Sequence, residues 1–324
     1  MKEHVQEARS DDYVAKEVAE GVRVVAMENC ASCHARREEL TKNDFHAGAR
    51  FDDHYRLALP DVPWMYFEDG QARVENVVYG SFWMSRMGHP GETCMDCHDP
   101  HKGKTLRPQT DNNHCLSCHS TGVNGATVVD TVTHSRHGIG SAGAQCVSCH
   151  MPERTYMGRD PRRDHGFTSP DPWLAEKYDT ANACMDCHSD KGLTWAQEQV
   201  HAWFPESPRR DRVRERAAAL HAAYSGEEGY AEKVLKLLQD EENIYWRSAY
   251  MRILARTPMT PGVLEIATKA ILAEEPIERD AGAMILSNRQ EGLAPLQVAL
   301  EDPSRMVRIR AAEAPVSYTH LRAH

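Results

Sequence analysis

The sequence predicts an all-α protein in two parts, a loop-rich domain over residues 1–204 and a HEAT-like α-solenoid over residues 205–315. Three observations predict this division. All ten cysteines lie in the first 187 residues, inside short polar segments. After residue 205 cysteine is absent, and Ala, Leu and Glu dominate. Similar helical segments then recur at a period of roughly 30 residues, a length typical of helical repeats.

The composition excludes several functions for these 324 residues. A formal net charge of −10 argues against a nucleic-acid partner, which needs a basic face. No run of about 18 apolar residues is present, so we expect no membrane span in this sequence. Histidine is abundant, with 18 residues, whereas phenylalanine is scarce, with 6. A core poor in Phe and rich in His indicates that something other than side chains fills part of the interior.

The ten cysteines form five copies of one motif, Cys-x-x-Cys-His, and none lies outside a motif. The five copies are Cys30-Ala31-Ser32-Cys33-His34, Cys94-Met95-Asp96-Cys97-His98, Cys115-Leu116-Ser117-Cys118-His119, Cys146-Val147-Ser148-Cys149-His150 and Cys184-Met185-Asp186-Cys187-His188. Two thiols three positions apart lie on one side of a helical turn and can reach the two vinyl groups on one edge of a haem. The following histidine then points at the iron as its proximal ligand, and the motif is the signature of c-type haem attachment. We therefore expect five covalently attached haem c groups, which makes residues 1–204 a pentahaem cytochrome c domain.

Three other interpretations use the same cysteines. Motifs two and three together match a four-cysteine zinc pattern, because 17 residues separate Cys97 from Cys115. Cys-x-x-Cys alone is also typical of a thioredoxin-like redox pair, and ten cysteines could form five disulfides. None of these requires a histidine after every second cysteine, yet all five pairs have it. The pattern therefore favours haem.

Each haem iron has a sixth coordination position, and a second histidine there makes an electron-transfer site. The candidates for this distal ligand lie in polar, turn-rich segments near the motifs: His54, His89, His101, His134, His137 and His165. We expect His101 and His165 to be ligands, and we expect His134 and His137 to supply one ligand between them.

The second part of the chain shows a weak helical repeat. Aligning Ala249, Ala281 and Ala311 superimposes three similar segments at offsets of 32 and 30 residues. An acidic turn precedes each segment, and Thr260-Pro261 is typical of an N-cap followed by a proline at the first helical position. Paired helices at this period predict a HEAT-like α-solenoid, whose faces usually bind a protein partner. An ordinary helical bundle is the alternative.

Several segments of the first part resemble a known family. They are Tyr79-Gly80-Ser81-Phe82-Trp83-Met84-Ser85-Arg86-Met87 before Cys94, then His98-Asp99-Pro100-His101, Cys149-His150-Met151-Pro152, Tyr156-Met157-Gly158, Arg162-Arg163-Asp164-His165 and Asn182-Ala183-Cys184. Over residues 30–204 the sequence resembles bacterial multihaem cytochromes with doubled CxxCH motifs and C-terminal HEAT or tetratricopeptide repeats. It is more loosely similar to the tetrahaem cytochromes of nitrifying bacteria and to the nitrite reductase and hydroxylamine oxidoreductase group. The resemblance implies that the haems stack in close-packed pairs.

The sequence departs from these relatives in several ways. It has no Cys-x-x-Cys-Lys motif, which is the catalytic haem site of the nitrite reductases. A further upstream haem motif and a signal peptide are missing, and Met1-Lys2-Glu3-His4 begins no apolar core. Residues 316–324 resemble a translated sequencing adapter, so we expect a non-native tail there. We therefore expect a fragment of a longer exported protein, periplasmic or otherwise extracytoplasmic.

Three functions compete. The first is electron transfer between redox partner proteins through a chain of bis-histidine haems, which the supply of distal candidates favours. The second is a haem oxidoreductase that acts on a small nitrogen or sulfur oxyanion at one open haem. The third is a repeat-based interaction scaffold. We expect an electron carrier rather than an enzyme, and the sequence marks no catalytic residue.

The cysteine pattern generates the first testable prediction. Protein produced in a host with the haem-attachment machinery should carry five haems in thioether linkage, because all ten cysteines lie in complete motifs. Intact-protein mass spectrometry counts the attached groups. A mass equal to the bare polypeptide, together with bound zinc, would contradict the haem interpretation.

Overall fold

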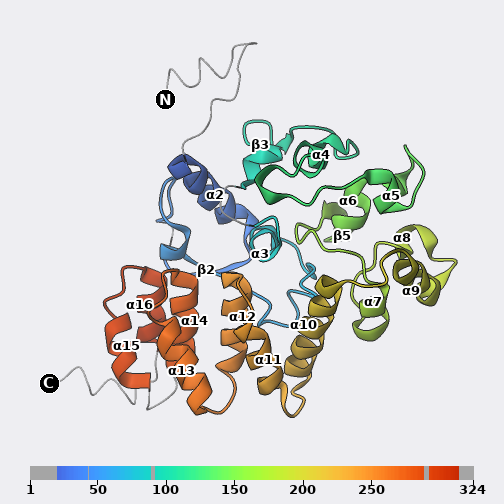
Figure 1. The fold of residues 1–324 in the computed structure, drawn as a ribbon. Coiled ribbons are helices and arrows are strands. Elements are labelled where there is room, and N and C mark those ends of the chain that lie inside the picture. Colours follow the sequence, from blue (N-terminus) through green and yellow to red (C-terminus); the bar gives the residue numbers. More distant parts are fainter. Residues whose placement is uncertain (1–19, 43, 89–91, 288–291, 314–324) are drawn as a thin grey trace, which may run out of the picture.

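The computed structural model describes residues 20–42, 44–88, 92–287 and 292–313. Short helices separated by long loops make up the first part of the chain, and longer helices packed side by side make up the second part (Figure 1). Three small sheets of two strands each also occur among the described residues. The predicted helical character is therefore confirmed. The prediction of a purely all-α fold is wrong, because the structure also contains these three sheets.

Each Cys-x-x-Cys-His motif of the first part lies on a short helical turn. Motif one ends helix α2 (Glu20–His34), and motif two begins the 3-10 helix η2 (Cys94–Asp96). Motif three lies in α4 (Asn113–His119), motif four forms α6 (Cys146–His150), and motif five includes α8 (Met185–His188). The two thiols of each motif therefore lie on consecutive turns of backbone, as the attachment of one flat group requires.

The other elements of the first part connect these turns. The helices are α3 (Val78–Met84), α5 (Thr131–Ser135), α7 (Pro172–Tyr178) and α9 (Gly192–Trp203), and the 3-10 helices are η1 (Phe51–Asp53), η3 (Val123–Gly125) and η4 (Ala142–Ala144). The antiparallel strand pairs are β1 (Arg37–Glu39) with β2 (Tyr55–Leu57), β3 (His98–Asp99) with β4 (Lys104–Thr105), and β5 (Glu153–Tyr156) with β6 (Asp160–Arg163).

Seven helices form the described second part. They are α10 (Pro208–Ser225), α11 (Tyr230–Gln239), α12 (Ile244–Leu254), α13 (Pro261–Ala270), α14 (Pro276–Leu286), α15 (Leu293–Ala299) and α16 (Arg305–Ala312). The Thr260 side chain accepts a hydrogen bond from the Val263 amide, 3.3 Å away, so the predicted N-cap is confirmed. No helix in the described residues is both long enough and apolar enough to cross a membrane.

The helices of the second part pack in pairs. Helix α11 packs against α12, α13 against α14, and α15 against α16, while α12, α14 and α16 also contact one another in that order. The three alanines aligned in the sequence, Ala249, Ala281 and Ala311, lie buried on α12, α14 and α16. A Cβ atom at Gly282 would lie 2.9 Å from the Cβ of Ala270, so α13 and α14 approach closely only because this position has no side chain.

One hydrophobic core crosses the predicted boundary at residue 204. Leu57, Leu59 and Tyr66 of the first part belong to the same buried cluster as Tyr250 and Leu254 of α12. Helix α3 adds hydrogen bonds, because its carbonyl oxygens at positions 83 and 84 accept from the side chains of Asn243, the N-cap of α12, and of Trp246 in α12. Part of the segment that carries the Cys-x-x-Cys-His motifs therefore folds against the helices of the second part.

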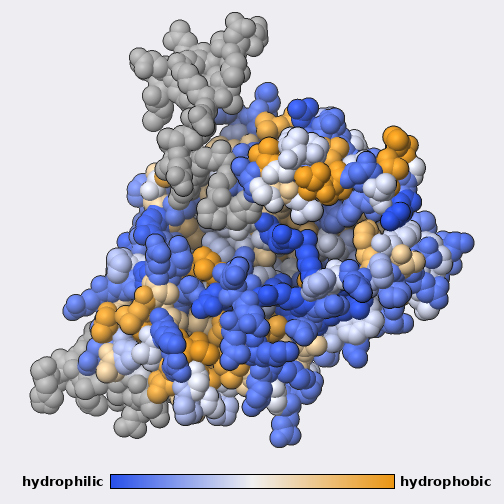
Figure 2. All heavy atoms as spheres, viewed as in Figure 1, coloured by the Kyte–Doolittle hydropathy of each residue, from blue (hydrophilic) through white to orange (hydrophobic). Residues whose placement is uncertain are grey.

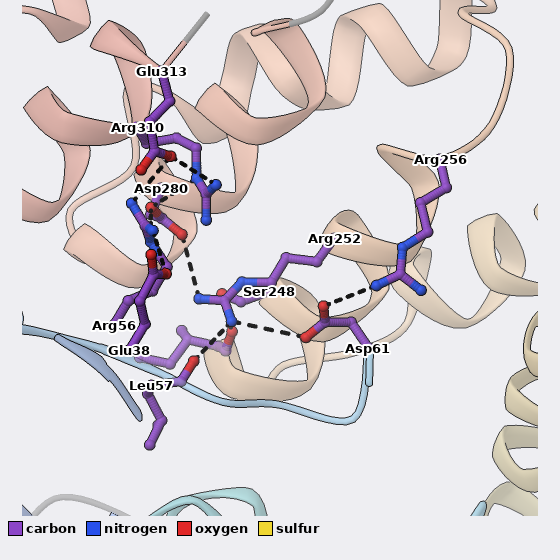
Figure 3. A network of polar contacts seen from close by, with 11 residues as sticks. Glu38, Arg56, Leu57, Asp61, Ser248, Arg252, Arg256, Asp280, Arg310 and Glu313 are labelled. Atoms are coloured by element: carbon purple, nitrogen blue, oxygen red, sulfur yellow. Dashed lines mark hydrogen bonds and ion pairs between the residues drawn. The ribbon is translucent and has the colours of Figure 1, made fainter. Parts of the chain in front are cut away.

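A buried ionic network strengthens this junction (Figure 3). The carboxylate of Asp280 on α14 is fully buried and lies within 3.0 to 3.3 Å of guanidinium nitrogens of Arg56, Arg252 and Arg310. These arginines come from β2, α12 and α16. Burying a charge is costly unless opposite charges and hydrogen bonds surround it, and here three elements converge on one carboxylate.

Replacing Asp280 with Asn should destabilise the protein strongly. The change leaves buried guanidinium groups without their shared counter-charge, a loss that costs about 3 kcal/mol or more in comparable sites. The free energy of unfolding, measured by urea titration followed by circular dichroism, tests this. Glu265→Gln is the matched control, because Glu265 forms an ion pair with the exposed Lys269 on the same helix. Equal effects of the two substitutions would contradict the structural role of the network.

Candidate haem-binding sites

The five motifs are neighbours in space in the order in which they occur in the sequence. The thiols of Cys30 and Cys94 hydrogen-bond to each other, and this bond lowers the pKa of Cys30 to about 7. Burial is the largest cause that raises the pKa of Cys97 to about 11, and nearby groups that include the Cys118 thiol raise it further. The effect of Cys118 on Cys97 indicates that motifs two and three also lie close together. All ten cysteines are free, so none of the disulfides considered above forms.

The second half of the series continues in the same way. The hydrogen bond to Cys115 lowers the pKa of Cys146 to about 7, which links motifs three and four. Burial first, and then the nearby Cys149 thiol, raises the pKa of Cys184 to about 11, which links motifs four and five. The attachment points therefore form one unbranched series, with short sulfur contacts between motifs one and two and between motifs three and four.

Three pairs of histidine rings face each other among the described residues. The ring centroids of His98 and His165 lie 6.2 Å apart with the planes 25° from parallel. The corresponding values are 5.9 Å and 19° for His134 and His150, and 6.2 Å and 36° for His137 and His188. A metal–imidazole bond is about 2 Å long, so two imidazoles on opposite sides of one metal ion have centroids roughly 6 Å apart. Each pair thus has the spacing of two axial ligands of one iron.

Backbone carbonyl groups orient several of these rings. The Nδ1 atoms lie 2.5 to 3.0 Å from carbonyl oxygens in four cases: His119 with Thr127, His137 with Ser135, His150 with Thr168 and His165 with Arg163. A carbonyl oxygen only accepts, so Nδ1 carries the proton and donates it. The lone pair is then on Nε2, which is the arrangement that protein sites use to orient a metal-binding histidine.

Burial favours the neutral form of four of the six facing rings. It is the largest cause that lowers the pKa of His98, His134, His150 and His165 below the ordinary value. For His98 the second cause is the neighbouring ring of His165. Neutral imidazole is the form that binds metals, so the environment favours ligation over protonation.

His134 and His137 lie three residues apart but face different partners. On a continuous helix, residues three apart would share one face. Helix α5 instead ends at Ser135, and Arg136 adopts a left-handed conformation with φ of 58°. This turn redirects the chain, so His134 faces His150 of motif four and His137 faces His188 of motif five. The expectation that these two histidines supply one ligand between them therefore differs from the geometry, which gives each its own partner.

The other distal candidates have different surroundings. His54 is buried, and its Nδ1 atom lies 2.7 Å from the Asp44 carboxylate. His101 is exposed, with its Nδ1 atom 3.8 Å from Asp99. His89 lies outside the described residues. His34 and His119 belong to none of these three pairs.

Aromatic side chains of α9 and of the residue after it contact three of the histidines, a feature that the sequence did not predict. The centroid of His188 lies 5.0 Å from that of Trp195, and the His137 centroid lies 6.2 Å from that of Trp203. Phe204, the residue after α9, lies 5.7 Å from His134. The signal in the sequence is the position of these rings directly after motif five in a chain poor in phenylalanine.

The residues beside motif two line an open surface pocket of about 510 Å³, and they include His98, Lys104, Leu106 and Arg107. This volume suits an organic cofactor, and the two cations suit carboxylate groups such as haem propionates. Leu106 is 56% exposed and Val128 is 62% exposed. Figure 2 shows hydrophobic residues at the surface over β3 and α4, in the same region. Exposed apolar side chains gathered in one region mark a binding surface, so these residues fit haem.

One family model and one solved structure are similar to this chain. Residues 129–256 match the model of the cytochrome c552 family. This span includes motifs four and five with both of their facing histidines. The crystal structure of the outer cell wall cytochrome OcwA superposes with a TM-score of 0.43 at 15% sequence identity, over 87% of this chain and 67% of that chain. No curated protein sequence matches this chain.

The motifs, the facing histidines and the family match together define the class of this protein. It is a multihaem c-type cytochrome that binds haem. Within it, residues 129–256 are similar to the cytochrome c552 family, and the match does not extend to the whole chain.

Removing a facing histidine should open one iron. In reduced protein, His165→Ala, His134→Ala and His137→Ala should each allow carbon monoxide to bind one haem in five, because each removes one axial nitrogen. The double variant His134→Ala/His137→Ala should open two. Absorption difference spectra with and without carbon monoxide measure the fraction. His221→Ala is the control, because its ring contacts Tyr178 and Glu68 instead. A double variant that opens only one iron would show that the two histidines serve the same haem.

Proposed function

We propose that this chain is an electron-transfer cytochrome in which five covalently attached haems follow one another in the order of the motifs. The haems are attached through the cysteines of the five motifs, and the proximal ligands are His34, His98, His119, His150 and His188. The single observation that carries the proposal is the set of three histidine pairs with ring centroids 5.9 to 6.2 Å apart. The neighbouring positions of successive motifs support the order.

The proposed distal ligands are His165 for motif two, His134 for motif four and His137 for motif five. When bound, each haem iron supplies a one-electron change between its ferric and ferrous forms. The protein closes both axial positions with imidazole nitrogen, which leaves no coordination site for a substrate. Carbonyl groups that accept the Nδ1 protons hold the rings in place, so little rearrangement accompanies electron transfer.

The ends of the series are proposed as the places where redox partner proteins exchange electrons. Cys33 of motif one and Cys187 of motif five are exposed, whereas the other eight motif cysteines are half-buried. A haem attached at either end therefore has an edge near the surface. The inner motifs are flanked by other motifs on both sides, which suits a path that runs through the protein.

A haem oxidoreductase is the second candidate function. Its supporting observation concerns motifs one and three, because His34 and His119 belong to none of the three histidine pairs. An iron with one open face at either motif could bind a small nitrogen or sulfur oxyanion. Arg163 offers little to such an anion, since its guanidinium donates to Gln109 and to carbonyl oxygens of Val147 and Met151. His54, His89 and His101 stay proposed as distal ligands for these motifs.

The helices from residue 205 onward are proposed to be HEAT-like repeats that bind a protein partner. The order of α12, α14 and α16, with one partner helix each, supports this proposal. A scaffold without redox function is disfavoured, because the core and the ionic network join these helices to the haem-attachment domain. We propose an extracytoplasmic location, since covalent haem attachment of this kind takes place outside the bacterial cytoplasm.

Reductive titration and a turnover assay together test the carrier function. The fully oxidised protein should accept five electrons from a titrated reductant, one for each motif. The dye-reduced protein should not turn over nitrite, hydroxylamine or tetrathionate at enzyme-like rates, on the order of 1 per second or faster. Turnover of any of these at such a rate would overturn the carrier function and establish the second candidate.

A further inference from the structure

The end of helix α9 meets two neighbouring distal histidines with two consecutive aromatic residues. The rings of Trp203 and His137 are perpendicular, with an angle of 78° and centroids 6.2 Å apart. The rings of Phe204 and His134 are 5.7 Å apart and tilted by 53°. Edge-on packing of this kind restricts rotation of the smaller ring, because the aromatic edge occupies the space into which it would turn.

The His137 ring is enclosed on further sides. Its Nδ1 atom lies 2.5 Å from the carbonyl oxygen of Ser135. On another side lies Gly143 of η4, where a Cβ atom would come within 2.2 Å of the imidazole ring. Only glycine leaves room for the ring in this orientation. The orientation of the His137 ring is therefore fixed by the hydrogen bond to Ser135, by the backbone at Gly143 and by the perpendicular indole ring of Trp203.

The segment that supplies these aromatic rings is itself tied to the second part of the chain. The Arg210 side chain on α10 donates a hydrogen bond of 2.9 Å to the carbonyl oxygen of Phe204. Helix α10 begins at Pro208, four residues after Phe204. The position of Trp203 and Phe204 thus depends on α9 on one side and on α10 on the other.

We propose that Trp203, Phe204 and Gly143 are positioning residues that direct His137 and His134 to two different irons. The inference rests on the proposed axial ligation and adds the residues that enforce it. Because Arg136 turns the chain between the two histidines, either ring could rotate away from its partner if its aromatic neighbour were removed. The aromatic residues at the end of α9 therefore hold the distal histidine of motif four and the distal histidine of motif five in place.

Carbon monoxide binding and electron paramagnetic resonance of the fully loaded protein test the proposal. In Trp203→Leu and in Gly143→Ala, about one iron in five should bind carbon monoxide after reduction. The oxidised protein should show a matching loss of one low-spin signal. Trp203→Phe should keep the iron closed, because a smaller aromatic ring still packs edge-on. Trp64→Leu is the matched control, since Trp64 is 50% exposed and has Arg36 over its ring.

A double variant identifies the affected iron. Trp203→Leu/His137→Ala should bind no more carbon monoxide than His137→Ala alone, because both changes open the same site. Additional binding in the double variant would overturn the proposal. If His137→Ala opens one iron while Trp203→Leu and Gly143→Ala leave all irons closed, the positioning role fails and the axial ligation stands. If His137→Ala opens none, the ligation itself fails.

If a variant attaches fewer than five haems, the number and positions of the attached haems still test the proposal. Loss confined to the haem on Cys184 and Cys187 supports the proposal, because that haem would then lack its second ligand. Loss of all five haems in both Trp203→Leu and Gly143→Ala would indicate a general role in folding and would overturn it.

Discussion

Pairs of imidazole rings with centroids 5.9 to 6.2 Å apart constrain the rest of the first part of this protein. The distance between the two rings matches that of two imidazoles bound on opposite sides of one metal ion. The surrounding chain is correspondingly short of helix and of large buried apolar residues. Flat cofactors between these rings would supply the interior that the loops lack. Loops of this length are uncommon in a domain that relies on its own side chains.

The second constraint is the junction between the two parts. The buried carboxylate of Asp280 forms ion pairs with guanidinium groups from β2, α12 and α16. The two parts also share one apolar core at this junction, so helices far away in sequence pack against residues near motif one. Motif five is held to the second part through α9 and α10, as the hydrogen bond from Arg210 to Phe204 indicates. The helices of the second part therefore support the attachment domain near motif one and near motif five.

The sequence predicted the features that depend on local spacing. The Cys-x-x-Cys-His motifs, the N-cap at Thr260 and the equivalence of Ala249, Ala281 and Ala311 follow from short-range patterns, and the structure agrees with them. His165 was singled out because it lies in a polar segment beside a motif, and it faces His98. The small sheets escaped prediction, because strands of two to four residues are too short to show alternation.

Features that depend on the path of the chain were not predictable. The different partners of His134 and His137 depend on one left-handed residue, Arg136, whose conformation no pattern marks. The environment of His54 depends on Asp44, ten residues away, whose carboxylate binds its Nδ1 atom. The common core across residue 204 depends on long-range packing, which a change in composition does not reveal.

The positions of the irons show whether the facing histidines are axial ligands. Anomalous diffraction from crystals of the haem-loaded protein at the iron absorption edge gives these positions without reference to the spectra. The account predicts five iron peaks that follow the order of the motifs. Three of the peaks should lie between the rings of His98 and His165, of His134 and His150, and of His137 and His188. Iron peaks away from these three gaps, or both rings of a pair bound to different irons, would contradict it.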